Sequence, residues 1–284
     1  MSAQPAPSGS CLACGKPSTL RCSSCSAKSN IDLFFCSKEH QKLLWPYHRL
    51  VCGDRAHPFR LPAYSQEEAD VLLERLRKTT TQPELCALQQ KMRFALNASE
   101  MSQSVFDDKV QSLIGQDGLL PGPKSGNSGR RSSSDANSIE DLRLLSWEWY
   151  CDAYDSEDGD HPTQHFVEHF THMYKHLTKN APPVDRESVW HSRMCHHLAA
   201  PFPMQAKATQ RWAGKGHPKG QKFVDWTKTR PTPEEFNEAM KIEAAYGAFT
   251  QFLRAVEGTE YAAFASIVRY NVNKPPPELL GSGQ

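Results

Sequence analysis

Residues 11–52 of this 284-residue chain decide its fold, and they read CLACGKPSTLRCSSCSAKSNIDLFFCSKEHQKLLWPYHRLVC. Six of the nine cysteines in the chain lie in this stretch, together with two histidines. They form four pairs in the order C-x2-C, C-x2-C, C-x3-H and H-x3-C, namely Cys11/Cys14, Cys22/Cys25, Cys36/His40 and His48/Cys52. Tetrahedral zinc takes four such sulfur or nitrogen ligands. The eight residues therefore predict two zinc sites.

The spacing within each pair predicts its local structure. A C-x2-C pair sits on a tight turn that lets both sulfurs face one ion. Residues spaced x3 lie one helical turn apart on the same face, so residues 36–52 should be largely helical, with Pro46 breaking the segment into two short helices. The spacing alone allows two combinations of the pairs. The linear one joins the first pair to the second and the third to the fourth, and the interleaved one joins the first to the third and the second to the fourth.

Composition and charge narrow the class of protein. Lys and Arg number 33 against 32 Asp and Glu, a formal net charge of +1, so the whole chain has no electrostatic attraction for nucleic acid or an anionic membrane. No apolar run approaches the roughly 20 residues of a membrane-spanning helix. The first ten residues lack the features of a secretion signal. We therefore expect an intracellular protein, in the nucleus or the cytoplasm, whose reduced thiols bind metal rather than form disulfides.

The run from Phe35 to Cys52, preceded by two C-x2-C pairs, resembles the MYND-type zinc finger. All eight positions match in order and spacing. His40 stands where the family usually has cysteine, and histidine is also a competent zinc ligand. The resemblance implies interleaved pairing, with one zinc ion held by Cys11, Cys14, Cys36 and His40 and the other by Cys22, Cys25, His48 and Cys52. Both ions would be structural, because four protein ligands leave no open position for water.

The resemblance also implies a function. MYND fingers mediate protein–protein contacts and often bind short proline-rich segments, and Gln41 and Trp45 match residues of that binding groove. An extended proline-rich peptide loses little entropy on binding, and an indole face beside an amide suits it. In the competing interpretation, Trp45 packs inside the finger and Gln41 is merely exposed. We expect an adaptor that recruits protein partners through its finger, without binding membranes or nucleic acid.

The fold class expected is a small two-zinc cross-brace finger followed by a mainly α-helical region. The sequence divides into a flexible tail (1–10), the finger (11–52), a helical segment (53–114), a disordered Gly/Ser-rich linker (115–137), an α-helical domain (138–274) and a loose tail (275–284). A capping box formed by Ser65 and Glu68 predicts a helix that continues to about residue 76. Apolar periodicity predicts further helices near residues 83–97, 138–150, 162–177, 185–198, 232–256 and 260–270.

A histidine stripe in the predicted helix 162–177 supports an alternative function. His161, His165, His169, His172 and His176 fall on one side of this segment, bordering an apolar face formed by Phe166, Phe170, Met173 and Leu177. Histidines four residues apart can share a metal ion, and His196-His197 offers a further pair of ligands. The alternative is a metal-dependent enzyme that uses this helix. We favour the adaptor, since the sequence holds no phosphate-binding loop, nucleophile elbow or HExxH motif.

Overall fold

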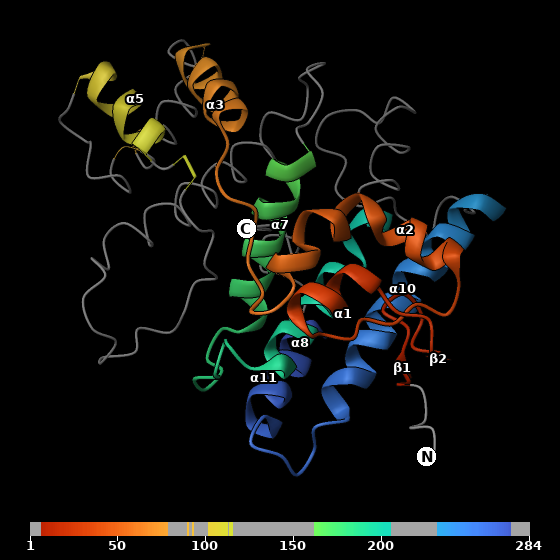
Figure 1. Ribbon diagram of the computed structural model, residues 1–284. Coiled ribbons are helices and arrows are strands. Elements are labelled where there is room, and N and C mark those ends of the chain that lie inside the picture. Colours follow the sequence, from red (N-terminus) through yellow and green to blue (C-terminus); the bar gives the residue numbers. More distant parts are fainter. Residues whose placement is uncertain are drawn as a thin grey trace, which may run out of the picture. The chain divides into compact units, whose positions relative to one another are not determined.

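The computed structural model describes residues 7–78, 90, 93, 102–112, 114–115, 162–205 and 232–273 (Figure 1). Its elements are two short strands and a series of helices: β1 (Gly9–Ser10), β2 (Pro17–Ser18), α1 (Ser23–Ser29), α2 (Lys38–His48), α3 (Gln66–Lys78), α5 (Gln103–Ser112), α7 (Pro162–Leu177), α8 (Val189–Ala199), α10 (Pro233–Arg254) and α11 (Ala262–Val272). The expected order, a cysteine-rich finger followed by a mainly helical region, is confirmed. None of the described helices is long and apolar enough to cross a membrane.

The chain forms two compact units. The first unit combines Met1–Phe59 with His176–Gln284, and the second covers Arg60–Lys175. The finger therefore shares a compact unit with α8, α10 and α11, which lie more than a hundred residues later in the chain. This grouping runs across the boundaries of the sequence-based division, in which the finger and the C-terminal helices are separate domains.

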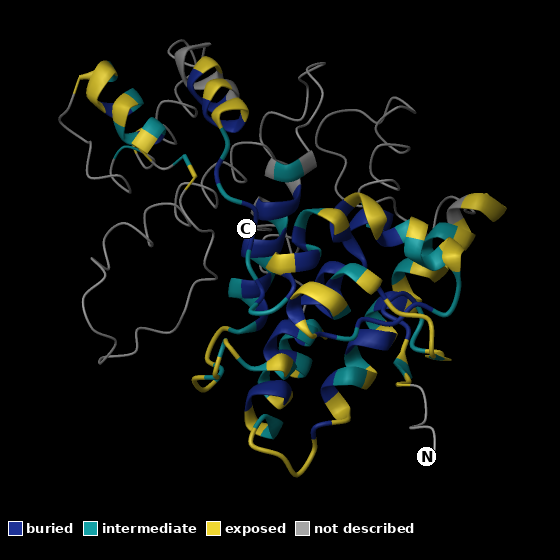
Figure 2. Ribbon diagram, viewed as in Figure 1, coloured by how far each residue is buried: buried dark blue, intermediate teal, exposed yellow. Residues whose placement is uncertain are grey.

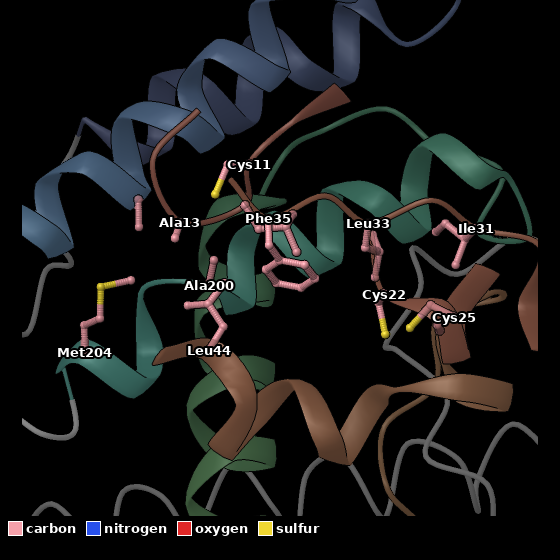
Figure 3. Close-up of a cluster of buried hydrophobic side chains, with 13 residues drawn as sticks. Cys11, Ala13, Cys22, Cys25, Ile31, Leu33, Phe35, Leu44, Ala200 and Met204 are labelled. Carbon is pink, nitrogen blue, oxygen red and sulfur yellow. The ribbon is translucent and has the colours of Figure 1, made fainter. Parts of the chain in front are cut away.

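The core of the first unit contains side chains from both parts of the chain. Figure 3 shows the buried ring of Phe35 in the finger together with Leu44 of α2, Ala200 just after α8, and Met204. Ala245 of α10 belongs to the same buried cluster. A finger of this size has little apolar surface of its own to bury, and the C-terminal helices supply the missing partners.

The first turn of the finger lies close against α10. Gly15 has a φ of +72°, a left-handed conformation that favours glycine. A Cβ added to Gly15 would lie 2.7 Å from Oε1 of Gln251 and 3.5 Å from Cβ of Ala248, both on α10. Glycine at this position therefore allows both the tight turn and the close approach of the helix.

A second link joins the segment after the finger to α8. The buried hydroxyl of Ser192 accepts a hydrogen bond from the backbone N–H of Phe59 at 3.1 Å and lies 2.9 Å from Nδ1 of His57. Four residues later, Nε2 of His196 donates to the carbonyl oxygen of Ala56 at 3.1 Å. The i and i+4 positions place both side chains on one face of α8. That face holds residues 56–59 by hydrogen bonds to their backbone.

The expected break at Pro46 is wrong. Helix α2 continues through Pro46 to His48, and a 3₁₀ turn follows at Arg49–Val51. Proline cannot donate to the carbonyl four residues earlier, and inside a long helix its ring and missing N–H disrupt the backbone. Here Pro46 occupies the last turn, so few residues follow that depend on an undistorted helix. At the other end, Ser37 caps α2 by accepting from the N–H of His40.

The second unit begins with the predicted capping box. Ser65 accepts from the N–H of Glu68 at 3.1 Å, and the Glu68 carboxylate accepts from the N–H of Ser65 at 2.8 Å, so α3 begins as the sequence predicts. Helix α5, which the apolar periodicity did not reveal, packs against α3 and buries Phe106 and Val110.

The helices predicted at 162–177, 185–198, 232–256 and 260–270 are confirmed as α7, α8, α10 and α11, with boundaries shifted by up to four residues. Most of α7 belongs to the second unit, where it buries Phe166, Phe170 and Tyr174. The predicted helices at 83–97 and 138–150, the linker at 115–137 and the tail at 275–284 lie wholly or almost wholly outside the described residues.

The Ser192 contacts generate a stability prediction. Replacing Ser192 with alanine removes the hydroxyl that accepts from the buried N–H of Phe59, at a cost of about 1–3 kcal/mol in the free energy of unfolding. Chemical denaturation of the zinc-loaded chain measures the change. The exposed α11 substitution Ser266→Ala is the matched control and should shift the free energy by less than about 0.5 kcal/mol. Equal effects of the two substitutions would contradict a structural role for the Ser192 hydroxyl.

Candidate metal centre

The first group of donor atoms comes from the first turn of the finger and from the start of α2. Cys11 and Cys14 flank a turn in which the N–H of Gly15 donates to the carbonyl of Cys11 at 2.8 Å. Cys36 and His40 lie one helical turn apart around the Ser37 cap. The Cys11 and Cys36 sulfurs lie 3.5 and 3.1 Å from Nδ1 of His40, and the Cys14 and Cys36 sulfurs are 3.5 Å apart.

The second group forms where α1 meets the end of α2. Cys22 precedes α1 and Cys25 lies in its first turn, which brings their sulfurs to one side (Figure 3). The Cys52 sulfur lies 3.6 Å from that of Cys22 and 3.5 Å from that of Cys25. Nε2 of His48 completes the group at 3.4 Å from the Cys22 sulfur and 3.6 Å from the Cys25 sulfur.

The two groups combine the pairs in the interleaved manner. Within each group, all four donor atoms lie within 4.8 Å of one another. Two sulfurs bound at 2.3 Å to one tetrahedral zinc ion would be roughly 3.8 Å apart, and a sulfur and a nitrogen roughly 3.5 Å apart. The observed separations of 3.1–3.6 Å are close to these values. The cysteines are free, and their sulfurs are too far apart for disulfide bonds. The two clusters fit two structural zinc ions.

The electrostatics of the second group favour a bound cation. Hydrogen bonds from Cys25 and Cys52 lower the pKa of Cys22, whereas hydrogen bonding to Cys22 and Cys52 raises the pKa of Cys25. These opposite shifts show that Cys22 and Cys25 do not both ionise unless a positive charge offsets their repulsion. Burial lowers the pKa of His48, but its hydrogen bonds to Cys22 and Cys52 outweigh this effect and raise it to about 9. The group therefore favours a positive charge among its donor atoms. A divalent cation supplies that charge in place of a proton on His48, which leaves the imidazole neutral and able to bind the metal.

His196 supports the second group from outside it, and sequence patterns did not single it out for this position. Its ring centroid lies 5.7 Å from that of His48 and 5.0 Å from that of Phe59. Burial is the main cause that lowers the pKa of His196, to about 3, so its imidazole is neutral when Nε2 donates to Ala56. Helix α8 thus holds both the ring of a zinc-ligand candidate and the segment that follows Cys52.

The histidine stripe of α7 forms no metal cluster within the described residues. His169, His172 and His176 are half-buried, so the stripe borders the apolar face as predicted. In the part of the chain that the structure describes, Cys, His, Asp and Glu donors gather into two groups, and both are in the finger. His161 and the side chain of His165 lie outside the described residues.

The two residues expected to contact a partner lie on α2. Gln41 is half-buried, and Trp45, one turn later, has 46% of its surface exposed. The Trp45 ring centroid is 6.0 Å from that of His48. The indole therefore rests beside the second donor group while remaining open to solvent.

The clusters predict a metal content. We expect the purified chain to carry two zinc ions and Cys25→Ala to lose at least the second, because one of its four donors is gone. Mass spectrometry of the native protein counts the ions. Cys195→Ala removes a buried thiol of α8 outside both groups and should retain both ions. A full zinc complement in Cys25→Ala would contradict the assignment of the second group.

Comparison with known proteins agrees with this geometry. A family model described as the MYND finger matches residues 11–52, which begin and end at the outermost donors of the two groups. No curated protein and no solved structure matches the chain. Residues 11–52 are therefore a MYND-type zinc finger, a domain generally involved in protein–protein interaction.

Proposed function

We propose that this chain is an adaptor whose MYND finger binds a short proline-rich segment of a partner protein at Gln41 and Trp45. The finger family supports interaction with proteins in general. The proline-rich partner and the two contact residues are our extension of it. In this proposal, the eight clustered Cys and His residues hold two structural zinc ions, which fix α2 in place.

The exposure of Trp45 is the observation that carries the proposal. Its neighbours Leu44 and Tyr47 are 3% and 6% exposed and anchor α2 in the protein, whereas the indole remains 46% exposed. Figure 2 shows the exposed residues of α2 along its outer side. Burying a half-exposed indole against a partner removes apolar surface from water without disturbing the finger's own core. The partial exposure of Trp45 therefore supports a role in binding over a role in the finger's own core.

The chemistry of the pair Gln41 and Trp45 suits an extended proline-rich peptide. Prolines lack backbone N–H groups, so such a segment offers carbonyl oxygens that need donors and apolar pyrrolidine rings that pack on an aromatic face. Gln41 lies four residues before Trp45, on the same side of α2. Its amide can donate to a peptide carbonyl while the indole packs against a proline ring.

A display library of random decapeptides tests the proposal on the zinc-loaded full chain. We expect selection of proline-rich sequences, and at least a tenfold weaker binding of the selected peptides to Trp45→Ala, measured by fluorescence anisotropy. Gln41→Ala should weaken binding less, because it removes one hydrogen bond rather than the central apolar contact. Zinc content and circular dichroism of both variants should match those of the unmodified chain.

Leu20→Ala is the control for this experiment. Leu20 is another exposed apolar residue of the finger, 40% exposed, and its removal should leave peptide binding unchanged. Selection without enrichment of proline would refute the ligand class. Proline-rich peptides that bind Trp45→Ala as tightly as the unmodified chain would refute the site. Loss of zinc in Trp45→Ala would assign the indole a structural role instead.

A further inference from the structure

Helix α2 carries a row of positive charges on the same side as Trp45. Lys38, Lys42 and Arg49 are all exposed, and we call them the cationic row. At about 100° per residue, the row and Trp45 lie within about 60° of one another around the helix axis. Trp45 comes between Lys42 and Arg49 in the sequence. The exposed indole therefore has cations on both sides of it along one face of the helix.

The charge of the cationic row is only partly offset within the described residues. None of its three side chains forms an ion pair there. Arg49 donates from Nε to the carbonyl oxygen of Pro46 at 3.3 Å, an acceptor that carries no full charge. Glu39 is the acidic residue of α2. Hydrogen bonds from its own N–H and from Ser37 lower the pKa of its carboxyl, and the charge of Lys42 adds to this effect. Three cations against one anion leave an excess of positive charge.

The dimensions of the row match those of an extended proline-rich peptide. A helix rises about 1.5 Å per residue, so Lys42 and Arg49 lie roughly 10 Å apart along the axis, and Lys38 and Arg49 roughly 16 Å apart. A proline-rich peptide advances about 3.1 Å per residue, so roughly three to five of its residues span these distances. A peptide that lies along α2 with a proline on Trp45 brings the residues that flank the proline close to the cations.

We propose that the partner segment bound at Trp45 is acidic, with carboxylates on both sides of its prolines that pair with the cationic row. This inference rests on the proposed function, because it concerns the same site. Each exposed ion pair adds little affinity by itself. Complementary charge also speeds association and disfavours ligands of the wrong sign, so the row selects acidic proline-rich segments over neutral and basic ones.

A nucleic acid is the other ligand with negative charges, and it fits the site less well. Proteins that bind single strands combine a basic groove with several aromatic side chains on which bases stack. Here the row has three cations beside one indole, and the formal net charge of the chain is only +1. The finger also belongs to a domain generally involved in protein–protein interaction.

Three peptides that differ at two positions test the proposal on the zinc-loaded full chain. Their sequences are AAEPPPEAA, AAQPPPQAA and AAKPPPKAA, and fluorescence anisotropy at low salt measures their binding. The acidic peptide should bind about three- to tenfold more tightly than the glutamine peptide, which has the same shape without the charge, and the lysine peptide should bind most weakly. Because salt screens exposed charges, the advantage of the acidic peptide should fall below about twofold in roughly 0.5 M NaCl.

A double variant tests the residues. The combination Lys42→Gln and Arg49→Gln should bind the acidic and glutamine peptides equally, while its affinity for the glutamine peptide stays close to that of the unmodified chain. Lys28→Gln is the matched control. It removes an exposed lysine of α1 whose ammonium already pairs with Asp54 at 3.6 Å, so the preference for the acidic peptide should remain. Zinc content and circular dichroism of all variants should match those of the unmodified chain.

The outcomes separate this inference from the proposed function. Equal binding of the three peptides, with Trp45→Ala still weakening each of them, would overturn the inference and leave the proposed function in place. If AAEAAAEAA binds as tightly as AAEPPPEAA and Trp45→Ala has no effect, the proposed function itself fails. A preference for the acidic peptide that persists in the double variant would overturn the role of the row. Tighter binding of a single-stranded oligothymidylate than of any peptide, lost in the double variant, would assign the row to phosphates instead.

Discussion

The crossing of the two metal clusters is the constraint on which the finger depends. Each cluster joins an early cysteine pair to a late pair, so two ions tie residues 11–25 to residues 36–52. Ahead of α2 the regular structure is slight, with strands of two residues and a helix, α1, of seven. Backbone hydrogen bonding of this extent contributes little to holding the segment together, and the three thiols in each of the two clusters repel one another once ionised. Zinc removes both difficulties, because it offsets the charge and couples metal binding to folding.

Packing against the C-terminal helices stabilises the finger in addition to the two metal clusters. Phe35 and Leu44 need a buried surface larger than the finger provides, and Ala200, Met204 and Ala245 supply it. Helix α8 contributes twice more, through Ser192 and His196, which bind the backbone of residues 56–59. His196 also contacts the ring of His48, so the metal cluster and the helical core meet at one imidazole pair. Helix α2, which carries Trp45, is thus positioned from two sides.

Much of the fold could be predicted from sequence because its signals are local. The Cys and His spacing predicts the donor groups, the Ser65/Glu68 box marks the start of α3, and apolar periodicity locates α7, α8, α10 and α11. The sequence did not predict helix α1, because its residues SSCSAKS carry no apolar stripe. The predicted helix break at Pro46 was wrong because the effect of a proline depends on how many helical residues follow it, and here few do. The roles of Ser192 and His196 could not be predicted, since nothing local shows that a polar side chain will be buried against a segment 133 or 140 residues away.

The shared core of the first unit has a consequence for how such a protein can evolve. Sequence similarity to the family stops at Cys52, yet the buried cluster continues through Ala56 into the helices of the C-terminal half. A recombination event that moved residues 11–52 alone into another gene would carry the metal donors but leave Leu44 and Phe35 facing water. The segment that the family model matches is therefore smaller than the buried core to which it belongs, and the C-terminal helices must fit the finger they cover.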